Sequence, residues 1–283
     1  MQVIVDANAG PCSGVKRALR LIEAQLAQDE EILALGSIIH NKAEMERLAG
    51  MGLTTIDQAV VEEGGLDRLR DKKVFVRSHG IGKKLDQQVR DTALAVCDGT
   101  CPNVRAIQKT IERYHQRGYQ ILIVGTPGHA EVVGLSGHCD DQAIVIQSPE
   151  EVAALPFAEK RLLVAQTTVA RNKFLAIQEK ILQIAPHTLV QDTTCRQVSN
   201  RHANMRNFAA SVDVLLLVGG KNSSNTRVLF EIAKQRNPRT FWIEAATDIE
   251  RDWLIADSIG ITGSASTPLW QLQKIKEYVE SIT

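Results

Sequence analysis

Short runs of apolar residues alternate along this chain with longer segments in which apolar residues recur at helical spacing. The runs ILAL at 32–35, ILIV at 121–124 and VLLLV at 214–218 predict strands, whereas the spacing at 16–27 and 103–116 predicts helices. Strands that are apolar throughout and separated by helices are typical of parallel sheets with both faces covered. The pattern therefore predicts an α/β fold with parallel sheets.

The chain also repeats itself around three of its cysteines. The segments GPCSGV, GTCPNV and TTCRQV contain Cys12, Cys101 and Cys195, which are separated by 89 and 94 residues. Polar residues follow each cysteine at matching offsets. At 28 residues past the cysteines stand His40, His129 and Ser223. At 66 to 71 residues past them stand His79, Thr167 and Ser266. Such a period predicts three pseudo-repeated α/β units of about 90 residues.

The strand pattern indicates how the units are joined. Strand-like runs lead into Cys101 and Cys195 and close the preceding unit, but the third unit ends in a predicted helix at 268–283. We expect the N-terminal run VIVDANAGPC to supply the missing strand, so that the units form a pseudo-threefold ring. The expected units span residues 1–95, 96–189 and 190–283.

All nine repeated positions follow strand-like runs, and ligands of parallel sheets collect at the carboxyl ends of strands. Three thiolates brought together there suit an iron–sulfur cluster, which with three cysteine ligands keeps one iron open. A structural zinc site normally has four ligands, often in C-x₂-C pairs that this chain lacks. Helices that start beside the cysteines help to carry the negative charge. Cys97 and Cys139 lie outside the repeat, and we interpret them as small buried residues.

Other polar residues indicate an anionic ligand. The loop GGKNSSNTR at 219–227 offers backbone N–H groups and hydroxyls ahead of a helix, which suits a phosphate, although an ordinary N-capped turn has the same composition. The imidazoles of His79 and His129 can donate to phosphate oxygens. Glu131, in GHAEVVG, is either a functional carboxylate or a surface residue favoured at a helix start. Both interpretations remain open.

Composition narrows the class of protein. The 283 residues contain 33 Lys+Arg and 33 Asp+Glu, a balance that argues against a nucleic-acid surface. No apolar run approaches the ~20 residues of a membrane span. The N-terminus lacks the basic start and apolar core of a signal peptide, so we expect a cytoplasmic protein. There, five cysteines indicate metal ligation, catalysis or burial before disulfides.

The motifs GPCSGVKRA, IIHN, RSHG, GTCP, GHAEV, AQTT, GGKNSSN and GSAST, in this order, resemble the LytB/IspH family. Its members are 4-hydroxy-3-methylbut-2-enyl diphosphate reductases, and the resemblance extends from residue 1 to about residue 270. It implies three α/β units around one 4Fe–4S cluster with three cysteine ligands. It also implies reduction of a small allylic diphosphate to isopentenyl and dimethylallyl diphosphate, the last step of the methylerythritol phosphate route. A one-electron donor of the ferredoxin or flavodoxin type is implied as the partner.

The resemblance also assigns residues. It implies that the cluster ligands are Cys12, Cys101 and Cys195. It assigns proton delivery to Glu131 and places Thr167 near the substrate hydroxyl. The implied substrate contacts are His40, His79, His129, Thr167, Ser223, Ser224, Asn225 and Ser266. The chain departs from the family pattern at Pro11, Gly99 and Ala130, which affect loop rigidity and not the groups that carry the chemistry.

One hypothesis of another class remains. The three cysteines of a non-enzymatic module could hold a structural metal while the polar loops bind a phosphorylated metabolite. A closed metal site needs a fourth ligand, however, and Glu131 has no task in such a module.

Overall fold

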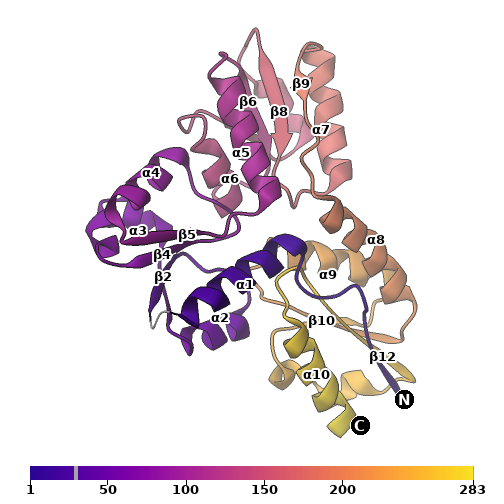
Figure 1. Cartoon of the computed structure of the whole chain (residues 1–283). Helices are drawn as coiled ribbons and strands as arrows, with labels where there is room; N and C mark the ends of the chain where they lie inside the picture. Colours follow the sequence, from indigo (N-terminus) through magenta and orange to yellow (C-terminus); the bar gives the residue numbers. More distant parts are fainter. Residues whose placement is uncertain (29–30, 283) are drawn as a thin grey trace. The chain divides into compact units, whose positions relative to one another are not determined.

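The computed structural model describes residues 1–28 and 31–282 and shows an α/β fold (Figure 1). Its strands form three four-stranded sheets, and every pair of neighbouring strands in them is parallel. The first sheet has the order β3 (Leu53–Ile56), β2 (Ile32–Leu35), β4 (Lys73–Val76), β5 (Ala95–Asp98). The second has the order β7 (Ile144–Ile146), β6 (Gln120–Val124), β8 (Arg161–Ala165), β9 (Leu189–Val190). The third has the order β11 (Thr240–Ile243), β10 (Val214–Val218), β12 (Ser258–Gly263), β1 (Gln2–Val5).

Helices connect the strands and include the predicted ones. The α-helices are α1 (Ser13–Leu26), α2 (Lys42–Ala49), α3 (Gln58–Glu62), α4 (Lys83–Thr92), α5 (Pro102–His115), α6 (Ala130–Ser136), α7 (Arg171–Ile184), α8 (Arg196–Ala210), α9 (Ser224–Arg236) and α10 (Leu269–Ile282). Short 3-10 helices are η1 (Gly65–Leu69), η2 (Pro149–Ala154), η3 (Ala246–Asp248) and η4 (Arg251–Leu254). The last residue of the predicted C-terminal helix, Thr283, lies outside the described residues.

The three sheets share one strand order, which confirms the prediction of three pseudo-repeated parallel α/β units. One edge of the three sheets is β3, β7 or β11, and the other edge is the strand that leads into a cysteine, β5, β9 or β1. For the third sheet that last strand is β1, where Val5 pairs with Ile261 of β12. The pseudo-threefold ring, and the unit boundaries at residues 95 and 189, stay predictions.

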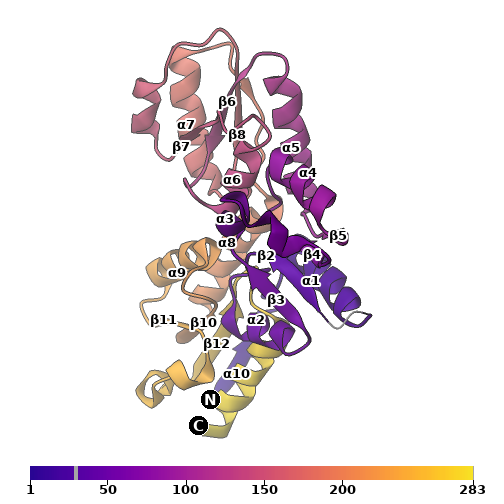
Figure 2. The same ribbon diagram turned by 90° about the vertical axis from the view of Figure 1, so that its left-hand side faces the viewer.

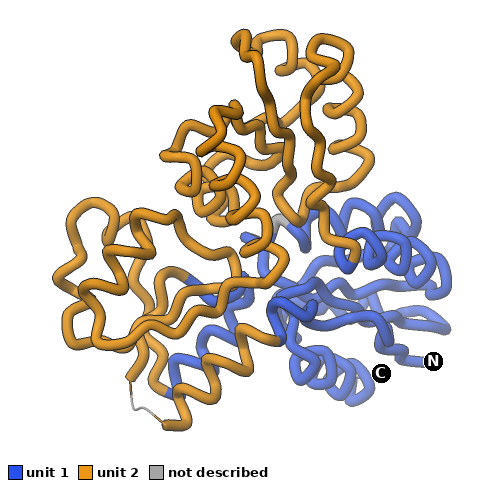
Figure 3. Tube along the Cα trace, turned by 45° about the horizontal axis from the view of Figure 1, so that its top comes forward, with its two compact units in different colours: residues 1–16, 37–51, 197–283 blue, residues 17–36, 52–196 orange. Residues whose placement is uncertain are grey.

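By internal contacts the chain divides into two compact units, which Figure 3 shows in blue and orange. The first comprises residues 1–16, 37–51 and 197–283 and holds the third sheet. The second comprises residues 17–36 and 52–196 and holds the first and second sheets.

The central strands of the second and third sheets are apolar on both faces because helices cover both. In the first unit, Leu216 and Val218 of β10 pack in the core that includes Leu272 of α10, whereas Leu215 and Leu217 pack in the core of α8 and α9. In the second unit, α5 and α7 lie on opposite sides of β6 and β8 (Figure 2). Side chains alternate across a strand, so a doubly covered strand is apolar at every position.

Among the described residues, none of the helices has both the length and the apolar character that a membrane crossing requires.

Candidate active site

Each of the three repeated cysteines lies between the end of a strand and the start of a helix. Cys12 follows β1, and its carbonyl accepts the N–H of Lys16 at 2.8 Å in the first turn of α1. Cys101 follows β5 as the N-cap residue of α5, and Cys195 stands between β9 and α8. All three side chains are partly exposed. The N-terminus of a helix stabilises a thiolate, so these positions suit metal ligation.

Backbone hydrogen bonds tie two of these cysteines to neighbouring loops within the second unit. The N–H of Cys101 donates to the carbonyl of Ser78 at 3.0 Å, and the N–H of Cys195 donates to the carbonyl of Thr167 at 2.9 Å. Each cysteine is therefore fixed beside the loop that follows the adjacent strand of its sheet, β4 or β8. Those are the loops that contain His79 and Thr167.

The other two cysteines have a different environment. Cys139 is fully buried, its S–H donates to the carbonyl of Ser136 at 3.2 Å, and burial raises the pKa of its thiol to about 11. Burial, followed by the nearby charge of Asp98, also raises the pKa of Cys97. Both remain thiols at neutral pH. The interpretation of Cys139 as a small buried residue is confirmed.

Glu131 is buried and paired with Thr167. It is the second residue of α6 and only 2% exposed, so the interpretation as a surface glutamate is wrong. Its Oε1 accepts the N–H of Thr167 at 2.6 Å, and its Oε2 accepts the hydroxyl of Thr167 at 2.7 Å. Burial raises the pKa of Glu131, and the hydrogen bonds from Thr167 oppose that shift.

This arrangement can move a proton. When Glu131 is protonated, it donates to the Thr167 hydroxyl oxygen at the same 2.7 Å separation. The Thr167 hydroxyl is then free to donate its own hydrogen to another acceptor, because a hydroxyl both donates and accepts. A proton on Glu131 therefore has a hydrogen-bonded path through the Thr167 hydroxyl.

Two histidines lie next to this pair in the second unit. His129 is the N-cap residue of α6, and its Nδ1 accepts the N–H of Glu131 at 3.1 Å. The neutral ring then carries its proton on Nε2, which is a donor for an anion. His79 contacts His129 edge to face, with ring centroids 5.4 Å apart. The loop of His79 lies close to α5, since a Cβ on Gly80 (φ +68°) would be 2.4 Å from Nε2 of Gln108.

The loop at residues 219–227, predicted to bind an anion, lies in the first unit. Ser223 is the N-cap residue of α9, and its Oγ accepts the N–H of Thr226 at 3.2 Å, which leaves the hydroxyl hydrogen for a ligand. Asn225 is 9% exposed, and within the described residues its Nδ2 and Oδ1 have no hydrogen-bond partner. An unsatisfied buried polar group costs about 1–3 kcal/mol, so this amide indicates a ligand. The side chain of Ser224 lies outside the described part of the structure.

Two further predicted contacts belong to the same unit. Ser266 follows β12, and its Oγ lies 2.9 Å from Oγ of Ser264. His40 immediately precedes Asn41, the N-cap residue of α2. A Cβ on Gly220 would lie 2.3 Å from the carbonyl oxygen of His40, so only glycine lets these two backbones meet.

The predicted residues thus fall into two groups. The second unit brings together Cys101, Cys195, His79, His129, Glu131 and Thr167. The first unit holds Cys12, His40, Ser223, Asn225 and Ser266. Convergence of the two groups on one cavity stays a prediction.

The sequence interpretation missed three polar residues at these positions. Ser264 lies in the GSAST motif, and Thr226, whose buried Oγ1 has no partner among the described residues, lies in GGKNSSNTR. Both motifs belong to the family pattern, but nothing in their sequence distinguishes a buried hydroxyl from an exposed one. Asn103, one position past the proline that follows Cys101, contacts the sulfur of Cys195 at 3.7 Å. No local sequence pattern predicts a contact between residues that are 92 positions apart in the chain.

Known proteins resemble this chain over nearly its whole length. A protein of Chlorobaculum tepidum named 4-hydroxy-3-methylbut-2-enyl diphosphate reductase is 34% identical, with 99% of this chain and 96% of that protein covered. A protein of the same name from Prosthecochloris aestuarii is 35% identical, with 99% of each chain covered.

Solved structures resemble it as well. A structure of (E)-4-hydroxy-3-methyl-but-2-enyl diphosphate reductase, described as the terminal enzyme of the non-mevalonate pathway, matches with a TM-score of 0.74 at 33% identity, covering 99% of this chain and 100% of that one. The E-1-hydroxy-2-methyl-but-2-enyl-4-diphosphate reductase of Plasmodium falciparum shares the fold, with a TM-score of 0.86 at 23% identity over 98% of this chain and 87% of that one. The family model described as LytB protein matches residues 3–280. With this match and relatives above 30% identity from end to end, the chain belongs to the LytB protein family.

Proposed function

We propose that this chain is a 4-hydroxy-3-methylbut-2-enyl diphosphate reductase, the activity for which its relatives are named. The reaction replaces the allylic C–OH bond of the substrate with a C–H bond. It consumes two electrons and two protons and releases one water. The products are isopentenyl and dimethylallyl diphosphate.

The buried Glu131–Thr167 pair is the observation that carries this proposal. Loss of the hydroxyl requires a proton on the leaving oxygen, and a carboxyl with a raised pKa keeps its proton to a higher pH than an ordinary carboxyl does. Thr167 passes it on, because its hydroxyl donates outward when Glu131 donates to it. A relay at this position has no use in a module that only binds a metabolite.

The diphosphate group needs hydrogen-bond donors, and we propose the following residues for that role. His129 would bind it through Nε2–H, the tautomer that follows when Nδ1 accepts the N–H of Glu131. The Ser223 hydroxyl, at the N-terminus of α9, and the amide of Asn225 are further donors. We propose that His40, His79, Thr167, Ser224 and Ser266 complete the set of substrate contacts.

The cysteines fit an iron–sulfur cluster. Cys12, Cys101 and Cys195 are partly exposed and stand at helix starts, where thiolates are stabilised, while Cys97 and Cys139 have raised pKa values. We propose that the first three hold one 4Fe–4S cluster. When bound, a cluster of this kind supplies single electrons and a Lewis-acidic iron.

The proposal includes a partner and a location. Reduction in one-electron steps requires a carrier, which we propose is a protein of the ferredoxin or flavodoxin type. Thiolate ligands and reduced carriers require a reducing compartment, so we propose that the enzyme works in the cytoplasm.

The test combines metal analysis with activity. Anaerobically reconstituted wild-type protein should be brown, contain about four iron and four sulfide per chain, and reduce the allylic diphosphate with a chemical one-electron donor. Cys12→Ser, Cys101→Ser and Cys195→Ser should each lose most of the iron and the activity, because each removes one of three protein ligands.

Cys97→Ser and Cys139→Ser are the matched controls, and both should keep the iron. A full cluster in any of the first three variants contradicts the ligand assignment. A colourless wild-type protein with one zinc per chain would favour the binding module instead.

A further inference from the structure

Asn103 lies between two of the proposed ligand loops. It is the second residue of α5, after Cys101 and Pro102, and its Nδ2 lies 3.7 Å from Sγ of Cys195. An N–H donor at this distance makes a hydrogen bond to sulfur. The repeat does not predict this contact, since the residues at the same offset from the other two cysteines are Gly14 and Gln197.

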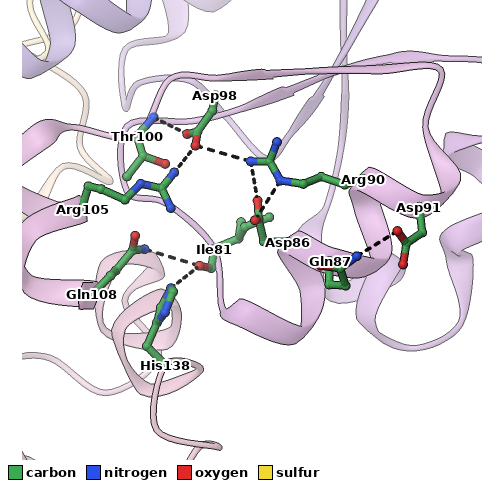
Figure 4. A network of polar contacts seen from close by, with 10 residues as sticks. All are labelled: Ile81, Asp86, Gln87, Arg90, Asp91, Asp98, Thr100, Arg105, Gln108 and His138. Carbon is green, nitrogen blue, oxygen red and sulfur yellow. Dashed lines mark hydrogen bonds and ion pairs between the residues drawn. The ribbon is translucent and has the colours of Figure 1, made fainter. Parts of the chain in front are cut away.

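The start of α5 is held firmly enough to keep this donor in place. Asp98 accepts the N–H of Thr100 at 2.9 Å and pairs with Arg105 in the first turns of α5 (Figure 4). Arg90 of α4 lies 3.6 Å from the same carboxylate and also binds Asp86. The loop that carries Cys101 is thereby fixed from both sides.

A second set of contacts fixes the middle of α5 and the loop that precedes the helix. Gln108 of α5 and His138 both contact the carbonyl of Ile81, at 3.4 Å and 3.2 Å (Figure 4). Arg17 contacts the carbonyl of Thr100 at 3.1 Å. These contacts fix the backbone of α5, and with it the position from which the Asn103 side chain reaches Cys195.

The loop that carries the sulfur of Cys195 is also fixed by hydrogen bonds. The N–H of Cys195 donates to Thr167, and the preceding Asp192 accepts the N–H of Thr194 at 3.1 Å and pairs with Arg171 at 2.9 Å. Asn103 and Cys195 thus meet as two separately fixed groups, all within one compact unit.

From this contact we propose that Asn103 tunes the reduction potential of the bound cluster, an inference that rests on the proposed function. Hydrogen bonds to ligand sulfurs are one of the factors that set the potential of iron–sulfur clusters. A reduced cluster carries one more negative charge, so its sulfurs accept more strongly. The amide of Asn103 therefore stabilises the reduced state more than the oxidised state, which raises the potential and eases electron uptake from the carrier.

The test is a redox titration, followed by electron paramagnetic resonance, of wild-type protein and variants with measured iron and sulfide contents. Asn103→Leu keeps the size of the side chain and removes the donor. At a fixed potential its ratio of reduced to oxidised cluster should fall about three- to tenfold, the worth of one typical intramolecular hydrogen bond. Tenfold corresponds to a shift of about 59 mV for a one-electron couple.

Asn103→Asp replaces the donor with a negative charge and should lower the potential further. The exposed Asn207→Leu on α8 is the matched control and should titrate as the wild type does. The iron–sulfur stretching bands in resonance Raman spectra should shift in the two Asn103 variants alone.

The outcomes separate the two proposals. Wild-type protein that binds no cluster overturns the proposed cofactor and this inference with it. A full cluster in Asn103→Leu with the wild-type potential and spectrum overturns this inference alone.

Discussion

At the scale of single residues, the proposed chemistry depends on one carboxyl group that is buried. Glu131 is almost fully buried, yet both of its oxygens accept hydrogen bonds from Thr167. Its N–H in turn orients the ring of His129. The side chain of Glu131 is the proton donor that we propose, and its backbone N–H fixes the tautomer of the neutral His129 ring.

Glu131→Gln should separate these two tasks. The variant keeps the backbone N–H and the size of the side chain but cannot release a proton. Cluster content and KM should stay near wild-type values, while kcat should fall by about 10²–10⁴-fold, as for a lost general acid. Steady-state kinetics beside iron analysis checks this, and a fully loaded variant with normal kcat would remove Glu131 from the mechanism.

The same substitution has a signature in stability. Since the folded state raises the pKa of Glu131 above its ordinary value of 4.5, the folded protein binds the proton more tightly than the unfolded chain does. The contribution of Glu131 to the free energy of unfolding should then be fully present below about pH 4.5 and be lost as the pH rises through the raised pKa. Glu131→Gln should lack this component of the decline. Denaturant titrations of both proteins over this range test the sign, and parallel pH profiles would contradict it.

At the scale of elements, several of the proposed site residues lie at the N-termini of helices. Cys101, His129 and Ser223 are the N-cap residues of α5, α6 and α9. A helix N-terminus carries a partial positive charge that attracts anions. The N-termini of these helices therefore suit a thiolate or a phosphate group. The alternative interpretation of residues 219–227 as an N-capped turn is correct in its geometry, because Ser223 does cap α9, and it is compatible with phosphate binding.

Ser223 should therefore have two measurable roles. Ser223→Ala removes the cap and the donor, so the protein should lose about 0.5–2 kcal/mol of stability and KM for the diphosphate should rise about tenfold or more. Ser223→Asp keeps an acceptor for the N–H of Thr226 but places a negative charge beside the diphosphate. Its melting temperature should stay close to that of the wild type while its KM rises further. An unchanged KM in Ser223→Asp would exclude Ser223 from the substrate contacts.

At the scale of the whole molecule, the first and last parts of the sequence share one sheet. Strand β1 pairs with β12, and the buried Asp6 just after β1 accepts the hydroxyl of Thr262 at 2.8 Å. Ile4 packs against the core that contains Leu215 and Leu217. The first compact unit therefore depends on residues at the very start of the chain.

Ile4→Asp should loosen that unit selectively, because it places an unpaired charge against an apolar core. Hydrogen exchange should speed up in peptides covering β10 and β12 of the first unit, while peptides covering β6 and β8 of the second keep their protection. Ile4→Val is the control and should change little. Equal loss of protection in both units would show that they do not open separately.

Much of this could be predicted from the sequence, because the relevant signals are local. Apolar runs, helical spacing and the three cysteine segments depend on residues close together in the chain, and they were enough to predict three parallel α/β units and the start of a helix at each cysteine. The same repeat singled out His79 and His129, at different offsets from their cysteines, and the structure brings the two rings into contact.

Tertiary structure decided what those residues can do. The sequence alone left Glu131 open between a surface and a functional residue, and its burial follows from a partner 36 positions away in Thr167. The contact of Asn103 with Cys195 joins residues 92 positions apart. Solvent exclusion and hydrogen-bond partners are properties of the packed chain, and they set pKa values and donor directions that no local pattern encodes.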